Sequence, residues 1–178
     1  MHGELPFGVR LRHAMSFDDA RGSLHEVHRV GDGDPQLRQW NFVTCTSNSV
    51  RGVHVHLRHT DHLAVVSGKF LFGLHDIRRD SPTFGCAALL DLDGARTRLL
   101  TIPPGVAHGF LCTEDGAQVY GMTHEWDPTD DLACRWDDRS LGFRLPAAAP
   151  IVSARDSAAG SLSQMTEDYA RATQLVPA

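Results

Sequence analysis

The sequence predicts an all-β fold, a barrel or a sandwich of strands, with one short helix near the C-terminal end. Short extended runs follow one another along most of the chain, separated by turn sequences such as GDGDP (31–35) and TEDG (113–116). Many short strands at this spacing are typical of sandwiches and barrels. Phe70, Phe72 and Leu74 are spaced two apart, so they share one face of a strand.

The extended runs give the expected strands in chain order. We expect strands at residues 24–29, 37–46, 50–57, 62–66, 70–77, 86–92, 98–102, 107–112 and 118–123. Gly, Pro, Asp and Asn gather between these runs, which marks the turns. The segment SLSQMTEDYARATQL (161–175) has a helical pattern, and Ser161 or Ser163 is its expected N-cap.

Length and composition predict one domain over residues 1–178. Of the 178 residues, 42% are hydrophobic and 22% are charged, as in ordinary globular proteins. A net charge of −5 without a run of Lys or Arg argues against a nucleic-acid partner. We see neither a secretory pattern nor an apolar run of about 18 residues, and therefore expect a cytoplasmic protein without a membrane partner. The scattered cysteines predict buried free thiols (Cys45, Cys86, Cys112 and Cys134).

The stretch RGVHVHLRHTDHLAVVSG (51–68) concentrates histidines. His54 and His56 are two apart and therefore share a strand face, with valines on the other face. The spacing H-x-H-x4-D-x6-G, followed by PPGVAH (103–108), resembles the two-part motif of the cupins. That resemblance implies a cupin fold, a jelly-roll β-barrel also described as a double-stranded β-helix. His59 and His62 are expected at its rim or surface.

In cupins this motif supplies metal ligands. The corresponding residues here are His54, His56, Asp61 and His108. Three imidazoles and a carboxylate suit Zn, Fe, Mn or Ni, with positions left for water or substrate. The spacing favours the metal over the alternative, in which the same residues line the barrel as polar side chains without a metal.

Further motifs resemble the dTDP-4-dehydrorhamnose 3,5-epimerases, a specific branch of the cupins. In chain order they are DARGSLHE (19–26), RQWN (38–41), RGVH (51–54), DIR (76–78), SPTFG (81–85), IPPGVAHGF (102–110), WDD (136–138), LG (141–142) and VSARD (152–156). The resemblance covers about residues 17–160. It implies an epimerase of a dTDP-4-keto-6-deoxyhexose in deoxysugar biosynthesis, without a cofactor, and a homodimer.

Inversion beside a ketone requires a base, a group that stabilises the enolate oxygen, and an acid on the opposite face. The resemblance implies that His54 is the base and that Asp156 orients it, because a carboxylate stabilises the imidazolium that forms. It also implies substrate-binding residues. These are Arg21 and Arg51 for the diphosphate, and Glu26, Gln39, Asn41, His108 and Trp126 elsewhere on the substrate.

The chain departs from the family pattern at two places. The family's lysine is missing, and Asp61 or His62 stands nearest its position. Two like charges about 4 Å apart repel by about 4 kcal/mol at an effective dielectric constant of about 20. An unpaired Asp61 would therefore oppose enolate formation, so either it points away or a cation lies against it.

The second departure concerns the acid. The segment THEWDP (123–128) places Trp126 where the family has a tyrosine, and an indole does not donate a proton to carbon at neutral pH. Glu125 or solvent would have to replace that tyrosine, because Tyr120 is expected to be a core residue.

Two hypotheses from different classes remain, beside a non-catalytic sugar-nucleotide binder. An epimerase would use His54 and Asp156, whereas a metal-dependent enzyme would use His54, His56, Asp61 and His108 as ligands. A histidine that binds a metal through its reactive nitrogen is not free to act as a base. We favour the epimerase, because its resemblance covers most of the chain and the metal pattern covers four residues.

Overall fold

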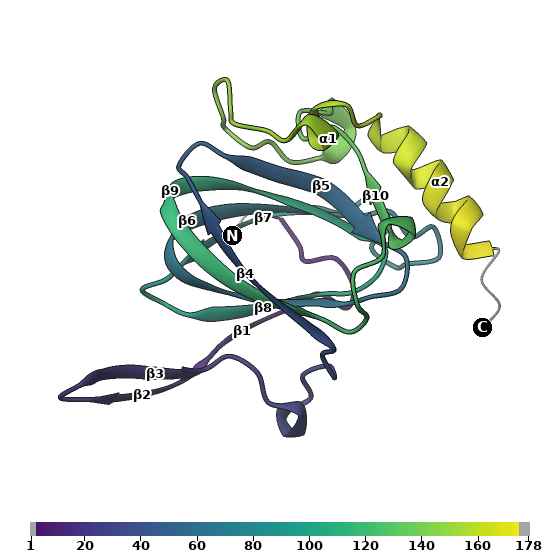
Figure 1. Cartoon of the computed structure of the whole chain (residues 1–178). Helices are drawn as coiled ribbons and strands as arrows, with labels where there is room; N and C mark the ends of the chain where they lie inside the picture. Colours follow the sequence, from purple (N-terminus) through teal and green to yellow (C-terminus); the bar gives the residue numbers. More distant parts are fainter. Residues whose placement is uncertain (1–2, 175–178) are drawn as a thin grey trace.

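Two long antiparallel strands, β6 (Asp61–Asp76) and β9 (Val106–Met122), form the spine of the fold (Figure 1). The computed structural model describes residues 3–174. The register between the two strands is irregular between Val65 and Phe70. The chain bends there, so each strand contributes one half to each of two layers.

Each half of the spine pairs with its own set of strands. The first layer adds β1 (Arg10–His13), β8 (Arg98–Ile102) and β4 (Gln39–Cys45) to the start of β6 and the end of β9. The second layer adds β7 (Ala87–Asp93), β5 (Val50–His56) and β10 (Asp131–Ala133) to the other two halves. This two-layered arrangement is a cupin jelly roll, and it confirms the predicted all-β class.

The remaining elements lie outside these layers. The strands β2 (Met15–Asp19) and β3 (Gly22–Glu26) form a hairpin that, within residues 3–174, pairs with no other strand and projects away from the layers (Figure 1). Short 3-10 turns occupy η1 (Val30–Asp32), η2 (Pro128–Asp130) and η3 (Arg139–Leu141). The C-terminal helices are α1 (Ala154–Ser157) and α2 (Leu162–Gln174).

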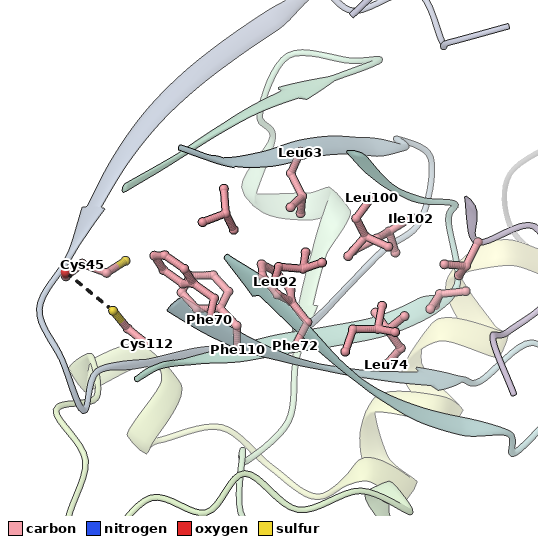
Figure 2. Close-up of a cluster of buried hydrophobic side chains, with 14 residues drawn as sticks. Cys45, Leu63, Phe70, Phe72, Leu74, Leu92, Leu100, Ile102, Phe110 and Cys112 are labelled. Atoms are coloured by element: carbon pink, nitrogen blue, oxygen red, sulfur yellow. Dashed lines mark hydrogen bonds between the residues drawn. The ribbon is translucent and has the colours of Figure 1, made fainter. Parts of the chain in front are cut away.

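The main hydrophobic core fills the space between the layers (Figure 2). Phe70, Phe72 and Leu74 all point into it, which confirms the alternation seen in the sequence. Phe110 packs edge-on against Phe70, with ring centroids 5.5 Å apart. Of the four free cysteines, all but the half-buried Cys86 are buried.

The outer face of the second layer is covered by helix α2. Val53 and Val55 are fully buried there against Leu162 and Met165. The amide of Gln164 donates to the Ser161 hydroxyl over 3.2 Å, so Ser161 caps the predicted helix. Residue 175, the last of the predicted helix, lies outside the described residues. No helix within residues 3–174 is long and apolar enough to cross a membrane.

Several expected strand boundaries were wrong. The runs at 62–66 and 70–77 belong to one strand, as do those at 107–112 and 118–123. Gly68 and the segment TEDG, which suggested turns, instead form the bend where both strands pass between layers. At Gly68 the φ angle is 74°, and an added Cβ would lie 2.5 Å from the Asp115 carbonyl oxygen. The strands β1, β2 and β10 are too short or too polar to stand out from sequence.

Candidate active site

A bulge in β5 turns three polar side chains toward the interior. Arg51 pairs with Phe110 and His54 pairs with His108, so three steps along β5 match two steps along β9. Residues three apart would otherwise face opposite sides of a strand. Because of the bulge, Arg51, His54 and His56 line the same cavity.

Gly52 makes this bulge possible. Its φ angle is 94°, and a Cβ at this position would lie 2.7 Å from the carbonyl oxygen of His108. Only glycine combines this backbone conformation with so close an approach between β5 and β9.

The cavity between the layers has a volume of about 450 Å³. The second layer lines it with Arg51, His54, His56, His108 and Phe110. The first layer faces them with Asp61, Leu63, Gln118, Tyr120 and Met122. A molecule bound in the cavity would therefore lie between two walls with different side chains.

The two predicted catalytic residues, His54 of β5 and Asp156 of α1, meet at the cavity. His54 Nε2 lies 2.7 Å from Asp156 Oδ1, and the Gly52 amide donates to Asp156 Oδ2 over 3.2 Å. Burial raises the pKa of Asp156, but the hydrogen bonds from His54 and Gly52 outweigh it and lower the pKa overall. Asp156 therefore stays ionised, and Nδ1 is the nitrogen of His54 left for a proton from a substrate.

Asp61 faces the cavity rather than pointing away, and histidines surround it. Its carboxylate lies 3.1 Å from His108 Nε2, 3.2 Å from His56 Nε2 and 3.5 Å from His59 Nε2. Despite full burial, which acts to raise it, the pKa of Asp61 is well below its usual range because these histidines hydrogen-bond to it.

His108 supplies the cation that the sequence required beside Asp61. Its Nδ1 donates to the Val106 carbonyl oxygen over 3.0 Å, and its Nε2 meets the Asp61 carboxylate. Burial lowers the pKa of His108, but Asp61 outweighs burial and raises it overall. Because both ring nitrogens face acceptors, the imidazolium form satisfies both contacts.

The expectation that His59 and His62 lie at the rim was wrong, because both side chains are 1% exposed. His59 Nδ1 lies 2.6 Å from the buried Asp130 carboxylate, and its ring stacks on His56. His62 lies between the Thr101 hydroxyl and the Val27 carbonyl oxygen, each at 2.9 Å. Their partners Asp130 and Val27 lie outside the strands, so the strand pattern did not predict that these two histidines are buried.

The four predicted metal ligands are only partly brought together. Ligand atoms of His56, Asp61 and His108 lie within 4.8 Å of one another, which fits two imidazoles and one carboxylate around a metal. His54 is not a member of this group, and its Nε2 contacts Asp156 instead. Of the four predicted ligands, the structure therefore brings three together.

Besides His108, two of the predicted substrate-binding residues line the cavity, namely Arg51 and Trp126. Arg51 forms no ion pair within residues 3–174, so its guanidinium is available to an anion. Trp126 is 53% exposed at the cavity, and its amide donates to Gln39 Oε1 over 2.8 Å. Gln39 in turn donates to Asn41 over 3.1 Å. Gln39 and Asn41 are not among the lining residues, but Gln39 contacts both Asn41 and the backbone of Trp126, which lines the cavity.

Arg21 and Glu26 are not brought to the cavity of their own chain. Both belong to the projecting hairpin of β2 and β3 (Figure 1). The Arg21 side chain is 90% exposed and pairs with Asp19 at 2.6 Å. Glu26 pairs with Arg29.

Sequence reasoning missed Tyr120, which lines the cavity and also packs against the main core. Its spacing of two from Gln118 and Met122, which line the same wall, was the signal that could have found it. Glu125, the proposed replacement acid, is instead exposed and is not among the lining residues.

The chain is similar to known proteins over most of its length. The family model described as dTDP-4-dehydrorhamnose 3,5-epimerase matches residues 7–164. A dTDP-4-dehydrorhamnose 3,5-epimerase of Neisseria gonorrhoeae is 31% identical over 172 residues, 92% of this chain; the match covers 52% of that relative, about half its length.

Solved structures give the same family. A rmlC epimerase of Mycobacterium tuberculosis superposes with a TM-score of 0.84 at 29% identity, covering 99% of this chain and 94% of that one. A 4-keto-6-deoxy sugar epimerase from the novobiocin gene cluster of Streptomyces spheroides superposes with a TM-score of 0.83 at 25% identity, over 99% and 94% of the two chains.

Proposed function

This chain belongs to the dTDP-4-dehydrorhamnose 3,5-epimerase family, and we propose that it inverts carbons beside the ketone of a dTDP-4-keto-6-deoxyhexose in deoxysugar biosynthesis. The observation that carries this proposal is the contact between His54 and Asp156 on the wall of the cavity. The family description and the sugar epimerase of Streptomyces spheroides support the substrate class.

The proposed reaction begins at His54. Its Nδ1 takes the proton from the carbon beside the ketone, and the electron pair of that C–H bond moves into an enolate. The ionised Asp156 at Nε2 stabilises the resulting imidazolium. Because only protons move, the reaction needs no redox cofactor.

In place of the missing lysine, Arg51 and His108 act at the cavity on the negative charge of substrate and enolate. Arg155 also lines the cavity, but it pairs with Asp131. Arg51 has no partner within the described chain, and its planar guanidinium matches phosphate oxygens. The ion pair of His108 with Asp61 limits the negative potential that Asp61 alone would impose on the enolate.

Nucleotide binding is tested by calorimetry with dTDP. We expect clear binding by the wild type and at least about 10-fold weaker binding by Arg51→Ala, since charge-assisted hydrogen bonds contribute about 1.5–3 kcal/mol. Arg96→Ala is the matched control, because Arg96 is exposed and pairs with Asp93 far from the cavity. A wild type that ignores dTDP at millimolar concentration would remove the nucleotide assignment.

A homodimer would give Arg21 and Glu26 a role. The hairpin that holds them exposes Phe17 and Leu24, and strand β4 exposes Phe42, so apolar surface is available for a second copy. In such a dimer the hairpin would place Arg21 at the cavity of the partner.

Mixed dimers test that arrangement. Chains carrying Arg21→Ala and chains carrying His54→Ala should each be inactive alone and regain activity on mixing, because one complete site then forms per mixed dimer. A monomer by sedimentation, or no recovery on mixing, would contradict it.

A metal-dependent enzyme remains the second candidate, because His56, Asp61 and His108 fit a three-ligand set. Bound there, a divalent metal would act as a Lewis acid toward a substrate oxygen. Elemental analysis of protein purified without chelator separates the two: about one metal per chain favours this candidate, and its absence favours the epimerase.

The proposed activity is tested directly with a dTDP-4-keto-6-deoxyhexose followed by proton NMR. The wild type should invert at least one carbon beside the ketone, and His54→Ala should lose at least about 100-fold of that rate with an unchanged thermal melt. His13→Ala is a control on a histidine outside the cavity. Equal turnover by His54→Ala would remove His54 as the base.

A further inference from the structure

We propose that Gln118 determines substrate specificity, because its side-chain amide hydrogen-bonds a hydroxyl group of the hexose bound in the cavity. The inference rests on the epimerase proposed above. It gives a role to a residue that neither the sequence motifs nor the comparisons assign.

Gln118 is a buried polar residue of β9 with apolar neighbours. It lies directly across from Val43 of β4 and Val65 of β6, so these two valines are its cross-strand neighbours on the same face. Leu63 and Phe72, which belong to the main hydrophobic core, line the cavity together with Gln118 (Figure 2). An apolar side chain would be expected at such a position, because a buried amide loses its hydrogen bonds to water.

The amide of Gln118 lacks the partner that its burial requires. Gln118 is 3% exposed, and its buried Oε1 has no hydrogen-bond partner within residues 3–174. The large majority of buried side-chain polar atoms do have a partner, so an unpaired one calls for an explanation. Because Gln118 lines the cavity, a bound molecule can supply the missing partner.

An uncharged group that both donates and accepts hydrogen bonds matches this amide best. A glutamine side chain carries an acceptor oxygen and a donor NH2 group, and its amide can turn either one toward a ligand. A phosphate does not fit, because an anion among apolar side chains requires a cation, and Arg51 supplies one elsewhere on the lining. In a dTDP-linked hexose, the matching groups are a hydroxyl of the hexose and the polar edge of thymine.

The hexose is the part of the substrate that shares the cavity with Gln118. In the proposed reaction His54 reaches a carbon beside the ketone, and both His54 and Gln118 line this cavity. A ribose and two phosphates separate thymine from the hexose, so thymine lies at the other end of the ligand. A 4-keto-6-deoxyhexose linked through carbon 1 keeps hydroxyl groups only at carbons 2 and 3. Gln118 therefore binds one of these two hydroxyls.

The experiment compares a dTDP-4-keto-6-deoxyhexose with its 2-deoxy and 3-deoxy analogues, by the rate of deuterium uptake from D2O. Gln118→Met removes the amide and keeps a side chain of similar length. We expect this variant to lose at least about 10-fold in kcat/KM for the parent sugar. For one of the two analogues, the variant and the wild type should agree within about threefold, because the hydroxyl that Gln118 binds is absent. Gln164→Met is the matched control, because Gln164 is exposed on α2, outside the cavity.

Two measurements without the hexose distinguish recognition from a structural role. The melting temperature of ligand-free Gln118→Met should exceed that of the wild type by about 2 to 4 °C, because an unpaired buried amide is removed. The affinity for dTDP, which has no hexose, should stay within about threefold of the wild type. A lower melting temperature would show that the amide supports the fold, and weaker binding of dTDP would place it at the nucleotide. Either result overturns the inference.

The wild type alone provides a check that no variant can disturb. It should use one of the two deoxy analogues at least about 10-fold less efficiently than the parent sugar. Equal use of all three sugars, or an equal loss on all three in Gln118→Met, overturns the inference and leaves the epimerase in place. A wild type that takes up no deuterium into any of the sugars rejects the epimerase, and the inference with it.

Discussion

The surroundings of Asp61 decide whether its negative charge opposes the proposed reaction. A carboxylate beside a developing enolate opposes the reaction, yet here it lies in contact with His56, His59 and His108. The negative charge of Asp61 is thus paired with His108 in a buried contact of opposite charges. Such a pair adds little net stability, but removal of one partner is costly because the other charge is left unpaired.

Asp61→Asn should therefore lower the free energy of unfolding by about 3 kcal/mol at neutral pH. Denaturation by urea, followed by intrinsic tryptophan fluorescence, gives this value. Asp80→Asn provides the control, because Asp80 is exposed and forms no ion pair within the described chain. A change below about 0.5 kcal/mol in Asp61→Asn would show that the histidines do not depend on this charge.

In the proposed reaction, Asp156 acts through His54, which it contacts at 2.7 Å. Asp156→Asn keeps the shape but removes the negative charge that stabilises the imidazolium, so kcat should fall by about 100- to 10,000-fold while KM stays within about threefold. Steady-state kinetics with the keto sugar measure both values. A rise in KM with unchanged kcat would place Asp156 in binding instead.

At the scale of elements, the bulge in β5 places Arg51 and His54 at the same cavity, and it depends on Gly52. Gly52→Ala would force a Cβ against the His108 carbonyl oxygen at 2.7 Å and a φ angle of 94° on a non-glycine residue. We expect a loss of about 3 kcal/mol or more in stability, since strained backbone and overpacking each cost about 1–3 kcal/mol. Gly31→Ala is the control, because an added Cβ there meets no atom within 4 Å. Equal melting temperatures for the two variants would contradict this account of the bulge.

The turn after β6 depends on the buried Asp76. Its carboxylate accepts hydrogen bonds from Arg78, Ser81 and Thr83 at 2.6–2.8 Å. Burial acts to raise the pKa of Asp76, but these bonds outweigh burial and lower it from 3.8 to about 2. A lowered pKa stabilises the fold above the pKa of the unfolded chain, and the contribution is lost as the pH falls toward the folded value.

The stability contributed by Asp76 is thus present above about pH 4 and disappears toward pH 2. Asp76→Asn should be less stable than the wild type by about 2 kcal/mol at pH 7, since one pKa unit corresponds to about 1.4 kcal/mol. The difference should shrink between pH 4 and pH 2 in urea denaturation. A difference that does not change with pH would mean that the hydrogen bonds, and not the charge, are what matter.

The strands and the helix also show how much of the fold could be predicted from the sequence. The alternation of Phe70, Phe72 and Leu74 and the helix after Ser161 were confirmed, because periodicity reports which face is buried. Strand ends were predicted less well. Gly68 is as suitable for a bend within a strand as for a turn between two strands, and only the partner strands decide between them.

At the scale of the whole molecule, the predictions failed where several elements meet. The contact of His54 with Asp156 was predicted because the family motifs name both residues. The buried position of His59 and the place of Tyr120 on the opposite wall were not predicted. Both depend on how two layers and a loop come together, which the strand pattern of one chain does not record.

The central claim is that His54 removes a proton from a carbon beside a ketone, and solvent deuterium tests it most directly. Protein depleted of metal by a chelator is incubated in D2O with a dTDP-4-keto-6-deoxyhexose, and the product is analysed by mass spectrometry and NMR. We predict one deuterium at each inverted carbon for the wild type and none for His54→Ala. Turnover that disappears with the chelator, returns with one divalent metal and leaves both carbons free of deuterium would contradict the claim.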